Sequence, residues 1–418
     1  MLKESYYNIY DRNGSVDRLY NSISKASAEC INEGTILSNL DKMKSDEVDL
    51  LKENGFLVDD DFREQGMIRY LFLKNLYSDK ILNVVLVPGL ECNFDCPYCF
   101  EKNLKKRYKR NIETYFSTLR KYAEQYFGEY ELIEISLFGG EPLLFYEECS
   151  AFLSWVEKKW KEKEICTSIV TNGALLTEKV ALDLIKHNCR SIQITIDGDK
   201  EKHNQTRCFK NGSRSYDLLM ENINCCLKLI PDSTRFNLRI NLNNIAVKRV
   251  KTTLDDIDIN FRNKVSVLFR PIYNTSCFKQ INENNFAELE SFYKIANDMG
   301  FKIVQNSYLY QACESCSGTN FYYIMPDLSI WKCINDLSYD KACIGQIDNN
   351  GIIKFNLTNF LDWLDNADCT ADVKCRKCKL MPDCYGGCTL YRSKNGKRSC
   401  KEFAMCSVPY MYEGDQNP

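Results

Sequence analysis

The chain has 418 residues, enough for two or three domains, and its 44% apolar and 27% charged residues are typical of a folded globular protein. With 55 Lys and Arg against 57 Asp and Glu, the net charge of -2 gives no reason to expect a nucleic-acid partner or an anionic membrane surface. No run approaches the ~20 apolar residues of a membrane span, and the first residues do not form a signal peptide, so we expect no membrane partner and a cytoplasmic location.

Cysteine and histidine usage is unusual, with 22 cysteines and 2 histidines. Because the cytosol is reducing, so many cysteines should not form a disulfide framework, and two histidines are too few for a histidine-rich metal site. Eleven cysteines lie between Cys313 and Cys406, and three more lie together at Cys92, Cys96 and Cys99. Thiolate-bound metal is the remaining role for these two groups, whereas the eight scattered cysteines are expected to be small buried residues.

Residues 1–82 are expected to form a small α+β, winged-helix-like module. Residues 6–10 are predicted to form a strand, and residues 45–53 and 61–77 are predicted to form helices. Short strands beside short helices are typical of such a module rather than of a large sheet.

The middle of the chain, residues 83–300, alternates between strand-like and helical segments. Strands are predicted at 84–87, 133–138, 167–170, 191–196, 236–240 and 265–269, with helices such as 114–126, 177–187, 216–229 and 284–299 between them. Such repeats predict an α/β fold with a parallel sheet and right-handed crossovers. Six strands are fewer than the eight of a closed barrel, so we predict an open, partial (β/α)6 barrel. Residues 301–418 have weak periodicity and half of the cysteines, and are predicted to form a cysteine-rich, cluster-binding domain.

A C-x3-C-x2-C loop follows the first strand of the barrel, at Cys92, Cys96 and Cys99. Three thiolates on one short loop can hold three irons of a 4Fe–4S cube and leave the fourth iron open. An open metal position suits a catalytic site, whereas a structural zinc site would need a fourth Cys or His, and none lies close in the sequence. We therefore predict a catalytic iron–sulfur cluster on this loop.

The loop resembles the signature of the radical S-adenosylmethionine (radical SAM) enzymes. In that family the open iron binds the amino and carboxylate groups of S-adenosylmethionine, and one-electron cleavage yields a 5′-deoxyadenosyl radical that abstracts a substrate hydrogen. The resemblance implies a catalytic role for Cys92, Cys96 and Cys99, with a 4Fe–4S cluster and S-adenosylmethionine as cofactors. The protein positions and insulates this cofactor chemistry.

Later strands end in motifs that resemble those of the same family, in the same order. The Gly-Gly-Glu-Pro run at 139–142 resembles the motif that binds the methionyl amine, and Thr171-Asn172 could reach ribose hydroxyls. Thr195-x-Asp197, followed by Arg207, resembles a further family motif, and Arg239 could reach the methionyl carboxylate; ordinary turn chemistry is the alternative for these later motifs. The resemblance implies S-adenosylmethionine contacts from Tyr98, Gly139, Gly140, Glu141, Pro142, Thr171, Asn172, Thr195, Asp197, Arg207 and Arg239.

The cysteine-rich tail resembles the SPASM domain, which appends auxiliary 4Fe–4S clusters to certain radical SAM enzymes. Its spacing is carried by Cys375, Cys378, Cys384, Cys388 and Cys406, whereas Leu328 stands where that family has a glycine. A zinc ribbon is the alternative, but there are more thiols than one tetrahedral site uses. The resemblance implies three clusters in the chain. Auxiliary cluster I would be held by Cys316, Cys333 and Cys388, completed by Cys313, and auxiliary cluster II by Cys375, Cys378, Cys384 and Cys406.

The likeness to SPASM enzymes implies a peptide or protein substrate. Residues 1–82 resemble the leader-recognition element of enzymes that mature ribosomally made peptides (RiPPs), which bind a leader at a strand edge. We therefore expect a maturase that installs a thioether, or alternatively a carbon–carbon, crosslink in a precursor peptide with a leader, and that uses a low-potential electron donor such as flavodoxin or ferredoxin.

Two other functions remain open. Side-chain oxidation of the sulfatase-maturating type is one, although that family has an aspartate where this chain has Ile334, directly after Cys333. A non-catalytic iron–sulfur electron-transfer or scaffold protein is the other. The intact three-cysteine loop and the run at 139–142 favour an enzyme over this last alternative.

Overall fold

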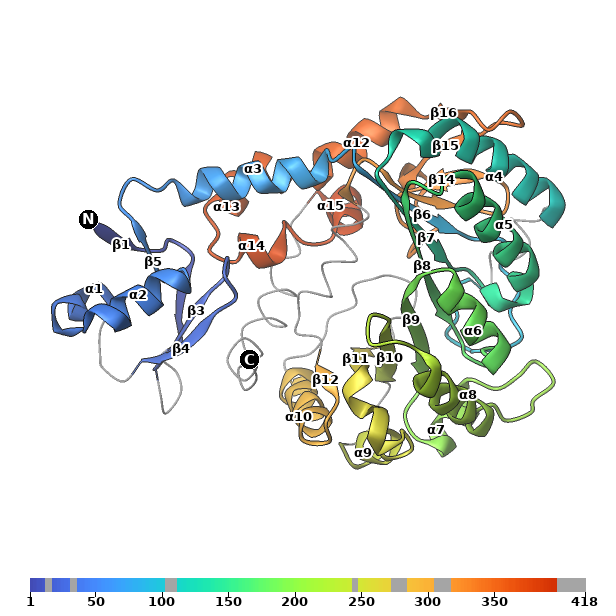
Figure 1. Ribbon diagram of the computed structural model, residues 1–418, viewed down its shortest axis with the longest axis horizontal. Coiled ribbons are helices and arrows are strands. Elements are labelled where there is room, and N and C mark those ends of the chain that lie inside the picture. Colours follow the sequence, from blue (N-terminus) through green and yellow to red (C-terminus); the bar gives the residue numbers. More distant parts are fainter. Residues whose placement is uncertain are drawn as a thin grey trace. The chain divides into compact units, whose positions relative to one another are not determined.

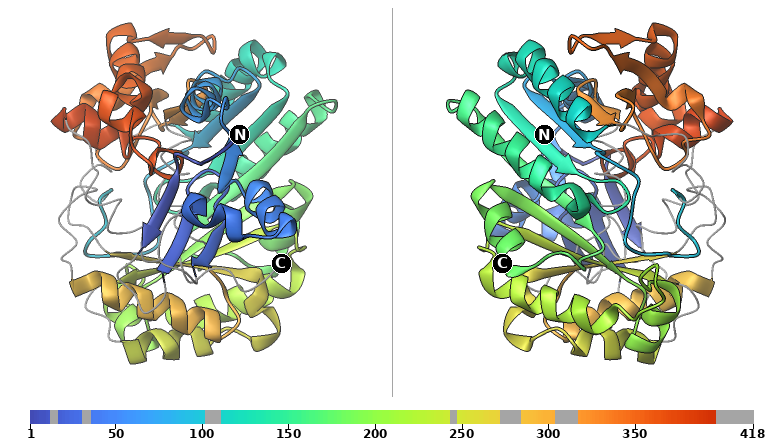
Figure 2. Two further views of the ribbon diagram at one scale, coloured as in Figure 1. Left: turned by 90° about the vertical axis from the view of Figure 1, so that its left-hand side faces the viewer. Right: turned by 90° about the vertical axis from the view of Figure 1, so that its right-hand side faces the viewer.

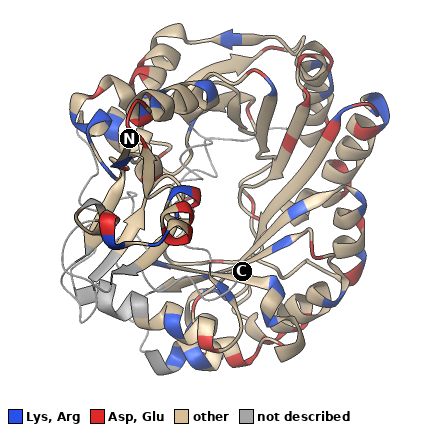
Figure 3. Cartoon of the chain, turned by 60° about the vertical axis from the view of Figure 1, so that its left-hand side comes forward, with Lys and Arg blue, Asp and Glu red and all other residues tan. Residues whose placement is uncertain are grey.

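The chain divides into two compact units in its computed structural model, which describes residues 1–11, 17–30, 36–101, 111–242, 247–271, 284–303 and 317–396 (Figure 1). Unit 1 comprises Met1–Tyr77, Gln305–Glu314 and Leu364–Pro418, and unit 2 comprises Ser78–Val304 and Ser315–Trp363. Basic and acidic positions are interspersed along the chain (Figure 3), in keeping with its net charge of -2. No helix within the described ranges is both long and apolar enough to cross a membrane.

Unit 2 is built on one sheet in which six parallel strands neighbour one another in chain order. These are β6 (Ile81–Leu86), β7 (Leu132–Leu137), β8 (Glu164–Thr171), β9 (Cys189–Ile196), β10 (Arg235–Leu242) and β11 (Val265–Pro271). The two-residue strand β12 (Lys302–Ile303) continues the parallel sheet beyond β11. The predicted partial barrel of an α/β protein is confirmed, with each strand at or within three residues of its predicted ends.

Helices lie along one face of the parallel strands (Figure 2). They are α4 (Ile112–Tyr126), α5 (Tyr146–Lys159), α6 (Glu178–Lys186), α7 (Lys200–Thr206), α8 (Tyr216–Leu229), α9 (Val247–Asp255) and α10 (Asn284–Asp298). Alternate residues of β7 are buried, such as Ile133 and Ile135, whereas Glu134 and Ser136 between them are only half-buried. The Ser136 hydroxyl lies 2.6 Å from that of Ser168 on β8. A closed barrel would fill this second face with apolar side chains, so its polar character fits an open barrel.

Four short strands extend the sheet on its other side, beyond β6. β13 (Phe321–Ile324) pairs with β6 in parallel, and β14 (Ser329–Trp331), β15 (Cys343–Ile347) and β16 (Ile353–Phe355) follow as antiparallel neighbours. Sequence periodicity did not predict them, because runs of three to five residues carry too little pattern. They place Cys333, just after β14, beside the barrel sheet within unit 2.

Unit 1 joins the N-terminal segment to the cysteine-rich end of the described chain. Its elements are β1 (Leu2–Glu4), β2 (Asn8–Asp11), β3 (Asp17–Asn21), β4 (Ser27–Cys30), α1 (Ile36–Asn39), α2 (Ser45–Glu53), β5 (Leu57–Asp59), α3 (Glu64–Leu76), α13 (Val373–Arg376), α14 (Met381–Cys384) and α15 (Thr389–Asn395), while α12 (Leu357–Ala367) leads into the unit from unit 2. β2, β3 and β4 form an antiparallel sheet, and β1 pairs with β5. The predicted helix at 45–53 is confirmed, but the strand predicted at 6–10 begins only at Asn8, because Tyr6 and Tyr7 lie in a turn.

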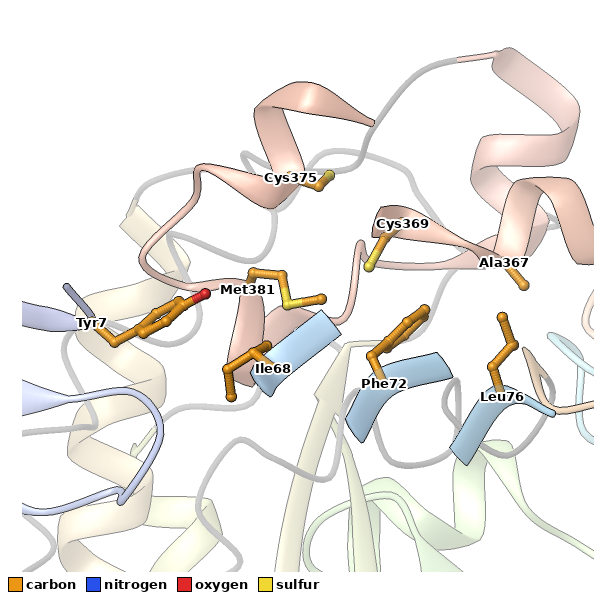
Figure 4. Close-up of a cluster of buried hydrophobic side chains, with 8 residues drawn as sticks. All are labelled: Tyr7, Ile68, Phe72, Leu76, Ala367, Cys369, Cys375 and Met381. Atoms are coloured by element: carbon orange, nitrogen blue, oxygen red, sulfur yellow. The ribbon is translucent and has the colours of Figure 1, made fainter. Parts of the chain in front are cut away.

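Helix α3 packs its apolar face against the cysteine-rich segment. Ile68, Phe72 and Leu76 recur every fourth residue, and Figure 4 shows them beside Ala367, Cys369 and Met381. Tyr385 stacks on Phe72 with ring centroids 5.8 Å apart. This shared core means that the two ends of the described chain fold as one body.

A buried polar contact also joins the two segments of unit 1. Lys25 forms an ion pair with Asp383, and the Tyr20 hydroxyl lies 3.2 Å from both oxygens of that carboxylate. Burial raises the pKa of Asp383 above its ordinary value, although Lys25 and Tyr20 oppose that shift. Since an unpaired buried carboxylate is costly, this contact favours the observed packing over any other.

Candidate active site

The three-cysteine loop lies after β6 and is held by the segment that follows α7. The backbone N–H of Asp95 donates to the Cys208 carbonyl (3.1 Å), and that of Lys210 donates to the Asn93 carbonyl (3.0 Å). Phe94 and Phe209 pair across this contact, with their ring centroids 4.9 Å apart. The loop is therefore fixed by backbone hydrogen bonds and ring packing, independently of its thiols.

Gly139 and Gly140 allow β7 to approach the segment before this loop. Gly139 has a φ of +97°, and a Cβ on Gly140 would lie 2.0 Å from the Glu91 carbonyl oxygen. The backbone N–H of Glu141 then donates to the same oxygen at 2.7 Å. No other residue type could sit at 140 without moving Glu91, so the glycine pair fixes the position from which the cysteine loop starts.

Glu141 is fully buried, and its carboxylate accepts hydrogen bonds from three protein groups. These are the Thr171 hydroxyl (2.6 Å), the backbone N–H of Asn172 (2.7 Å) and that of Leu143 (3.1 Å). Burial raises the pKa of Glu141, and the hydrogen bonds only partly offset the shift. The carboxylate thus positions the turn after β8; its predicted contact with the methionyl ammonium remains a prediction. Pro142 follows as the first residue of a short 3-10 helix.

Asn172 connects this turn to the cysteine loop. Its side-chain amide donates to Oδ1 of Asn93 at 2.6 Å and lies 3.6 Å from Sγ of Cys92. An amide donor near a thiolate sulfur stabilises its negative charge and, in iron–sulfur proteins, influences the reduction potential. Asn172 was also predicted to reach ribose hydroxyls, and that contact stays a prediction.

Asp197, at the end of β9, is the centre of a buried hydrogen-bond network. It accepts from the Tyr98 hydroxyl (2.6 Å), the Thr206 hydroxyl (2.7 Å) and the Asn241 side-chain amide (2.9 Å). Arg207 donates in turn to the Tyr98 oxygen at 3.2 Å. The structure therefore brings together three of the predicted residues, Tyr98, Asp197 and Arg207. Sequence reasoning missed Thr206 as a site residue, although it directly precedes Arg207.

His203 is buried and neutral within the same network. Its Nδ1 accepts from the backbone N–H of Asp197 (3.3 Å), and its Nε2 lies 3.1 Å from the Ser215 hydroxyl. Because that hydroxyl donates to the Arg207 carbonyl, Nε2 must carry the imidazole hydrogen. Burial, with a further contribution from Arg207, lowers the pKa of His203 to about 3. Its role is to fix Asp197 and Arg207, not to transfer protons near neutral pH.

Arg207 is buried, and its Nε hydrogen has no acceptor among the described residues. Burial opposes its charge, but Tyr98, Cys96 and Asp197 outweigh that effect and raise the pKa of Arg207. Cys96 lies close by, and burial raises the pKa of its thiol to about 11 while Arg207 opposes the shift. A buried cation with an unused donor, close to the Cys96 thiol, fits a site that receives an anionic group.

Two more guanidinium groups belong to residues of β10 and β11, namely Arg239 within β10 and Arg270 near the end of β11. Arg239 donates from Nε to Asn241 (3.1 Å), and desolvation, with Arg270 and Arg207 nearby, lowers its pKa to about 10. Asn241 and Arg270 are partners in the strand register, so they lie on the same side of the sheet. Thr195 is paired with Arg239 in the neighbouring register and is half-buried. Arg270 was not predicted, because the periodicity of β11 alone does not show which end carries function.

The predicted tail ligands are divided between the two units. Cys333 is buried in unit 2, whereas Cys375, Cys378, Cys384 and Cys388 belong to unit 1. Cys375 packs with Cys369 in the core shared with α3, and Cys378 packs against it. The predicted ligands Cys313, Cys316 and Cys406 lie outside the described residues.

The barrel residues fit the predicted cofactors by their donor chemistry. Cys92, Cys96 and Cys99 are reduced thiols. No three Cys, His, Asp or Glu side chains converge on a single-metal site in the described ranges, but a 4Fe–4S cluster takes each thiolate on a different iron and does not need such convergence. When bound, the cluster and S-adenosylmethionine supply radical hydrogen abstraction. The protein contributes three features to this site. Asn93 and Phe94 fix the cysteine loop, Asn172 places its side-chain amide near Cys92, and Arg207 offers an Nε–H donor that has no acceptor among the described residues.

Known proteins share this arrangement of sequence motifs. The model of the Radical SAM superfamily matches residues 86–256. The chain is 26% identical over 368 residues to a cysteine-type anaerobic sulfatase-maturating enzyme of Clostridium novyi. This alignment covers 78% of this chain and 93% of that protein. The chain is also 26% identical over 263 residues to the radical SAM cyclopropyl synthase TigE of Paramaledivibacter caminithermalis, covering 54% of this chain and 55% of that protein.

Solved structures share the fold. The sulfatase-maturating enzyme anSMEcpe with bound AdoMet has a TM-score of 0.59 at 19% identity, covering 79% of this chain and 97% of that one. SuiB of Streptococcus suis, bound to precursor peptide SuiA, has a TM-score of 0.51 at 16% identity, covering 93% of this chain and 95% of that one. The cysteine loop and Arg207 lie within the residues that match the superfamily model, so residues 86–256 form a radical SAM domain, and the chain is similar in sequence to a sulfatase-maturating enzyme and to a radical SAM cyclopropyl synthase.

Proposed function

We propose that the chain is a maturase that installs an oxidative crosslink in a ribosomally made precursor peptide. A thioether from a precursor cysteine is favoured, with a carbon–carbon bond as the alternative. As the carbon–sulfur bond forms, the carbon loses a hydrogen atom and the thiol loses a proton, and one further electron leaves the peptide. The auxiliary clusters accept that electron, and a low-potential donor such as flavodoxin or ferredoxin supplies the electron that starts each event.

The observation that carries this proposal is the extent of the match to SuiB. That fold covers 93% of this chain, whereas the anSMEcpe folds cover 79–80%. The part left unmatched by SuiB is much smaller than residues 1–77, so the shared fold must extend into the N-terminal segment. SuiB was solved with a precursor peptide, and the same class of partner is our proposal for this chain.

The N-terminal sheet has the edges that a leader peptide would need. Within the described residues, β2 and β4 each pair on one side only, with β3 between them. An extended leader can add a strand to either edge through backbone hydrogen bonds. In this proposal residues 1–82 bind the leader, residues 83–300 carry the radical chemistry, and residues 301–418 hold the auxiliary clusters.

The proposed cluster ligands follow the SPASM-like spacing. Auxiliary cluster I takes Cys313, Cys316, Cys333 and Cys388, and auxiliary cluster II takes Cys375, Cys378, Cys384 and Cys406. With four protein thiolates, cluster I has no open iron and transfers electrons only. These cysteines lie far from the barrel loop in the sequence, which supports separate roles for the two groups. In this proposal S-adenosylmethionine is cleaved only at the cluster held by Cys92, Cys96 and Cys99.

Side-chain oxidation of the sulfatase-maturating type is the second candidate. It is favoured by the relative of Clostridium novyi, which aligns along 93% of its own length. Against it stands Ile334, a buried apolar residue directly after Cys333, where sulfatase-maturating enzymes have an aspartate base. An apolar side chain there cannot remove the proton that this oxidation requires.

Incubation with a candidate precursor tests the proposal. The probes are synthetic peptides taken from short open reading frames found near this gene, each incubated anaerobically with the chain, S-adenosylmethionine and a chemical reductant. We expect the peptide to lose two hydrogens per crosslink and one 5′-deoxyadenosine to form per event, with fragment ions missing across the linked segment. The triple variant Cys92→Ala/Cys96→Ala/Cys99→Ala should form neither product.

Three results separate the alternatives. A peptide that gains mass, or loses no hydrogen, would contradict crosslinking. Conversion of a single cysteine or serine to an aldehyde, with no linked fragments, would favour the sulfatase-maturating type. 5′-Deoxyadenosine made by the triple variant would contradict the assignment of the catalytic loop.

A further inference from the structure

Unit 1 contains a cavity of about 700 Å³ that the proposed function does not use. It lies between the start of the chain, the first half of α3 and the cysteine-rich segment. Lys3 and Glu4 of β1 line it, together with Tyr6, Tyr7, Phe62, Arg63, Glu64, Arg69 and Arg376. Its volume is in the range of ligand-binding pockets rather than of packing defects.

The side chains of the three arginines that line the cavity have no partner among the described residues. Arg63, Arg69 and Arg376 are exposed, and none of their side chains makes a hydrogen bond, an ion pair or a ring contact with a described residue. They come from separate places in the chain, two on or next to α3 and one at the end of α13. Three arginines that line one cavity, with no described partner for their side chains, favour an anionic occupant.

The lining also holds two carboxylates, Glu4 and Glu64, and a fourth cation, Lys3. Glu64 is buried and accepts hydrogen bonds from the Ser5 hydroxyl and from the backbone N–H of Tyr6 (2.8 Å). Glu4 accepts from the Tyr10 hydroxyl at 3.0 Å. The Lys3 ammonium already has acceptors, since it donates to the backbone carbonyls of Asp60 and Phe62. Four cations against two carboxylates leave the lining with a formal net charge of +2, and the cations whose side chains make no described contact are the three arginines.

The remaining lining suits an extended peptide. β1 has a strand neighbour, β5, on one side only within the described part of the chain. Phe62 and Tyr6 expose about two-fifths of their surface and offer apolar contacts beside the arginines. A continuous polyphosphate chain would meet Glu4 and these rings, whereas a peptide can alternate carboxylates with apolar side chains.

We infer that this cavity binds an acidic segment of a peptide, with its carboxylates on Arg63, Arg69 and Arg376. The inference deepens the proposed function and rests on it for the identity of the peptide, which would be the acidic part of the precursor's leader. The site is distinct from the edges of β2 and β4, so a leader could use both.

A fluorescent acidic peptide tests the site without any turnover. The probe is a fluorescein-labelled peptide of glutamates with interspersed leucines, and its twin has glutamine in place of every glutamate. We expect the acidic probe to bind the full chain with an affinity that falls as salt rises, and the twin not to bind. The triple variant Arg63→Ala/Arg69→Ala/Arg376→Ala should weaken binding about tenfold, since each exposed charge pair contributes up to ~1 kcal/mol.

The matched control is Arg214→Ala, an exposed arginine of unit 2 with no described contact, which should bind as the unmodified chain does. Arg376→Gln alone gives a second, milder variant and should show an intermediate loss. Equal binding of the glutamine twin, or an unchanged affinity in both cavity variants, would overturn the inference. Equal binding of oligothymidylate of the same charge would also overturn it, by showing a general polyanion surface.

The probe has no residue to be crosslinked, so this result is independent of the proposed function. Loss of probe binding in the variants, in a chain that modifies no peptide, would uphold the site and reject the maturase. Crosslinking by an unmodified chain that does not bind the acidic probe would reject the site and uphold the maturase.

Discussion

Tyr98 and Asp197 are 99 residues apart in the sequence, and the Tyr98 hydroxyl donates a hydrogen bond of 2.6 Å to Oδ2 of Asp197. This bond ties the cysteine loop after β6 to the end of β9. The Tyr98 oxygen also accepts from Arg207, so hydrogen bonds connect the loop, the buried carboxylate and the buried guanidinium. Tyr98 therefore adds a side-chain contact to the backbone hydrogen bonds that hold the loop.

Replacing Tyr98 with Phe should weaken S-adenosylmethionine binding by about tenfold. The change removes the donor to Asp197 and the acceptor of Arg207, and leaving buried polar groups unpaired costs ~1–3 kcal/mol. Anaerobic titration of the cofactor measures the effect. The control is Tyr70→Phe, which alters an exposed tyrosine on α3. Equal affinities in the two variants would show that the hydroxyl does not position the site.

His203 predicts a specific dependence of stability on pH. Its pKa in the folded chain is about 3, below the ordinary 6.5, because burial disfavours the imidazolium. Below pH 6.5 the unfolded chain therefore binds a proton that the folded chain does not, so this contribution to stability is complete above pH 6.5 and is lost as the pH falls from 6.5 towards 3. The free energy of unfolding should fall by up to ~1.4 kcal/mol per pH unit from this group.

The variant His203→Asn keeps an acceptor for the Asp197 N–H and removes the titrating ring. Urea unfolding between pH 7 and 5 should show a shallower loss of stability for this variant than for the unmodified chain. Because the chain has only two histidines, ring ¹⁵N spectra can also assign the Nε2–H form directly. A ring of His203 that becomes charged near pH 6 would contradict the structure.

Truncating Phe72 to Ala should destabilise the cysteine-rich segment as well as α3. Phe72 is buried between α3 and the segment that contains Cys369 and Cys375, and it stacks on Tyr385. Removing a buried phenyl ring costs ~3–5 kcal/mol. Urea unfolding measures the loss, and limited proteolysis should show new cleavage within residues 364–396.

Leu71→Ala is the control for that prediction, because Leu71 is an exposed neighbour on the same helix. It should change neither the unfolding free energy nor the cleavage pattern. If Phe72→Ala opens only the N-terminal segment to protease, then the shared core is not cooperative. Because α3 packs on the cysteine-rich segment, deleting residues 1–77 would also expose the buried apolar side chains of that segment.

The parallel strands could be predicted because their pattern is local. Ile133 and Ile135 recur at a period of two on a strand long enough to show it, and α8 was predicted at Tyr216–Leu229 with the same ends. β14 could not be predicted, because its three residues pair through the edge of a sheet assembled elsewhere in the chain.

Residue types at the site were predictable, but their contacts were not. Glu141 was predicted as a site residue, but the sequence did not indicate that its oxygens accept from Thr171, Asn172 and Leu143. The contact of Tyr20 with Asp383 joins residues 363 positions apart, and no local pattern encodes it. Asn172 near Sγ of Cys92 is a similar case, since a turn residue gives no sign of which sulfur it will reach.

Iron content provides the last prediction, and it separates the cluster sites from one another. Three 4Fe–4S clusters require about 12 irons per chain after anaerobic reconstitution. The variant Cys92→Ala/Cys96→Ala/Cys99→Ala should retain about 8, and Cys375→Ala/Cys378→Ala should also retain about 8, because each change removes one set of ligands. Only the first should abolish 5′-deoxyadenosine formation, since the tail ligands lie outside the barrel. Cys225→Ala, on α8, is the control and should keep the full iron content. Zinc at one or two equivalents with little iron would show instead that the tail is a zinc site.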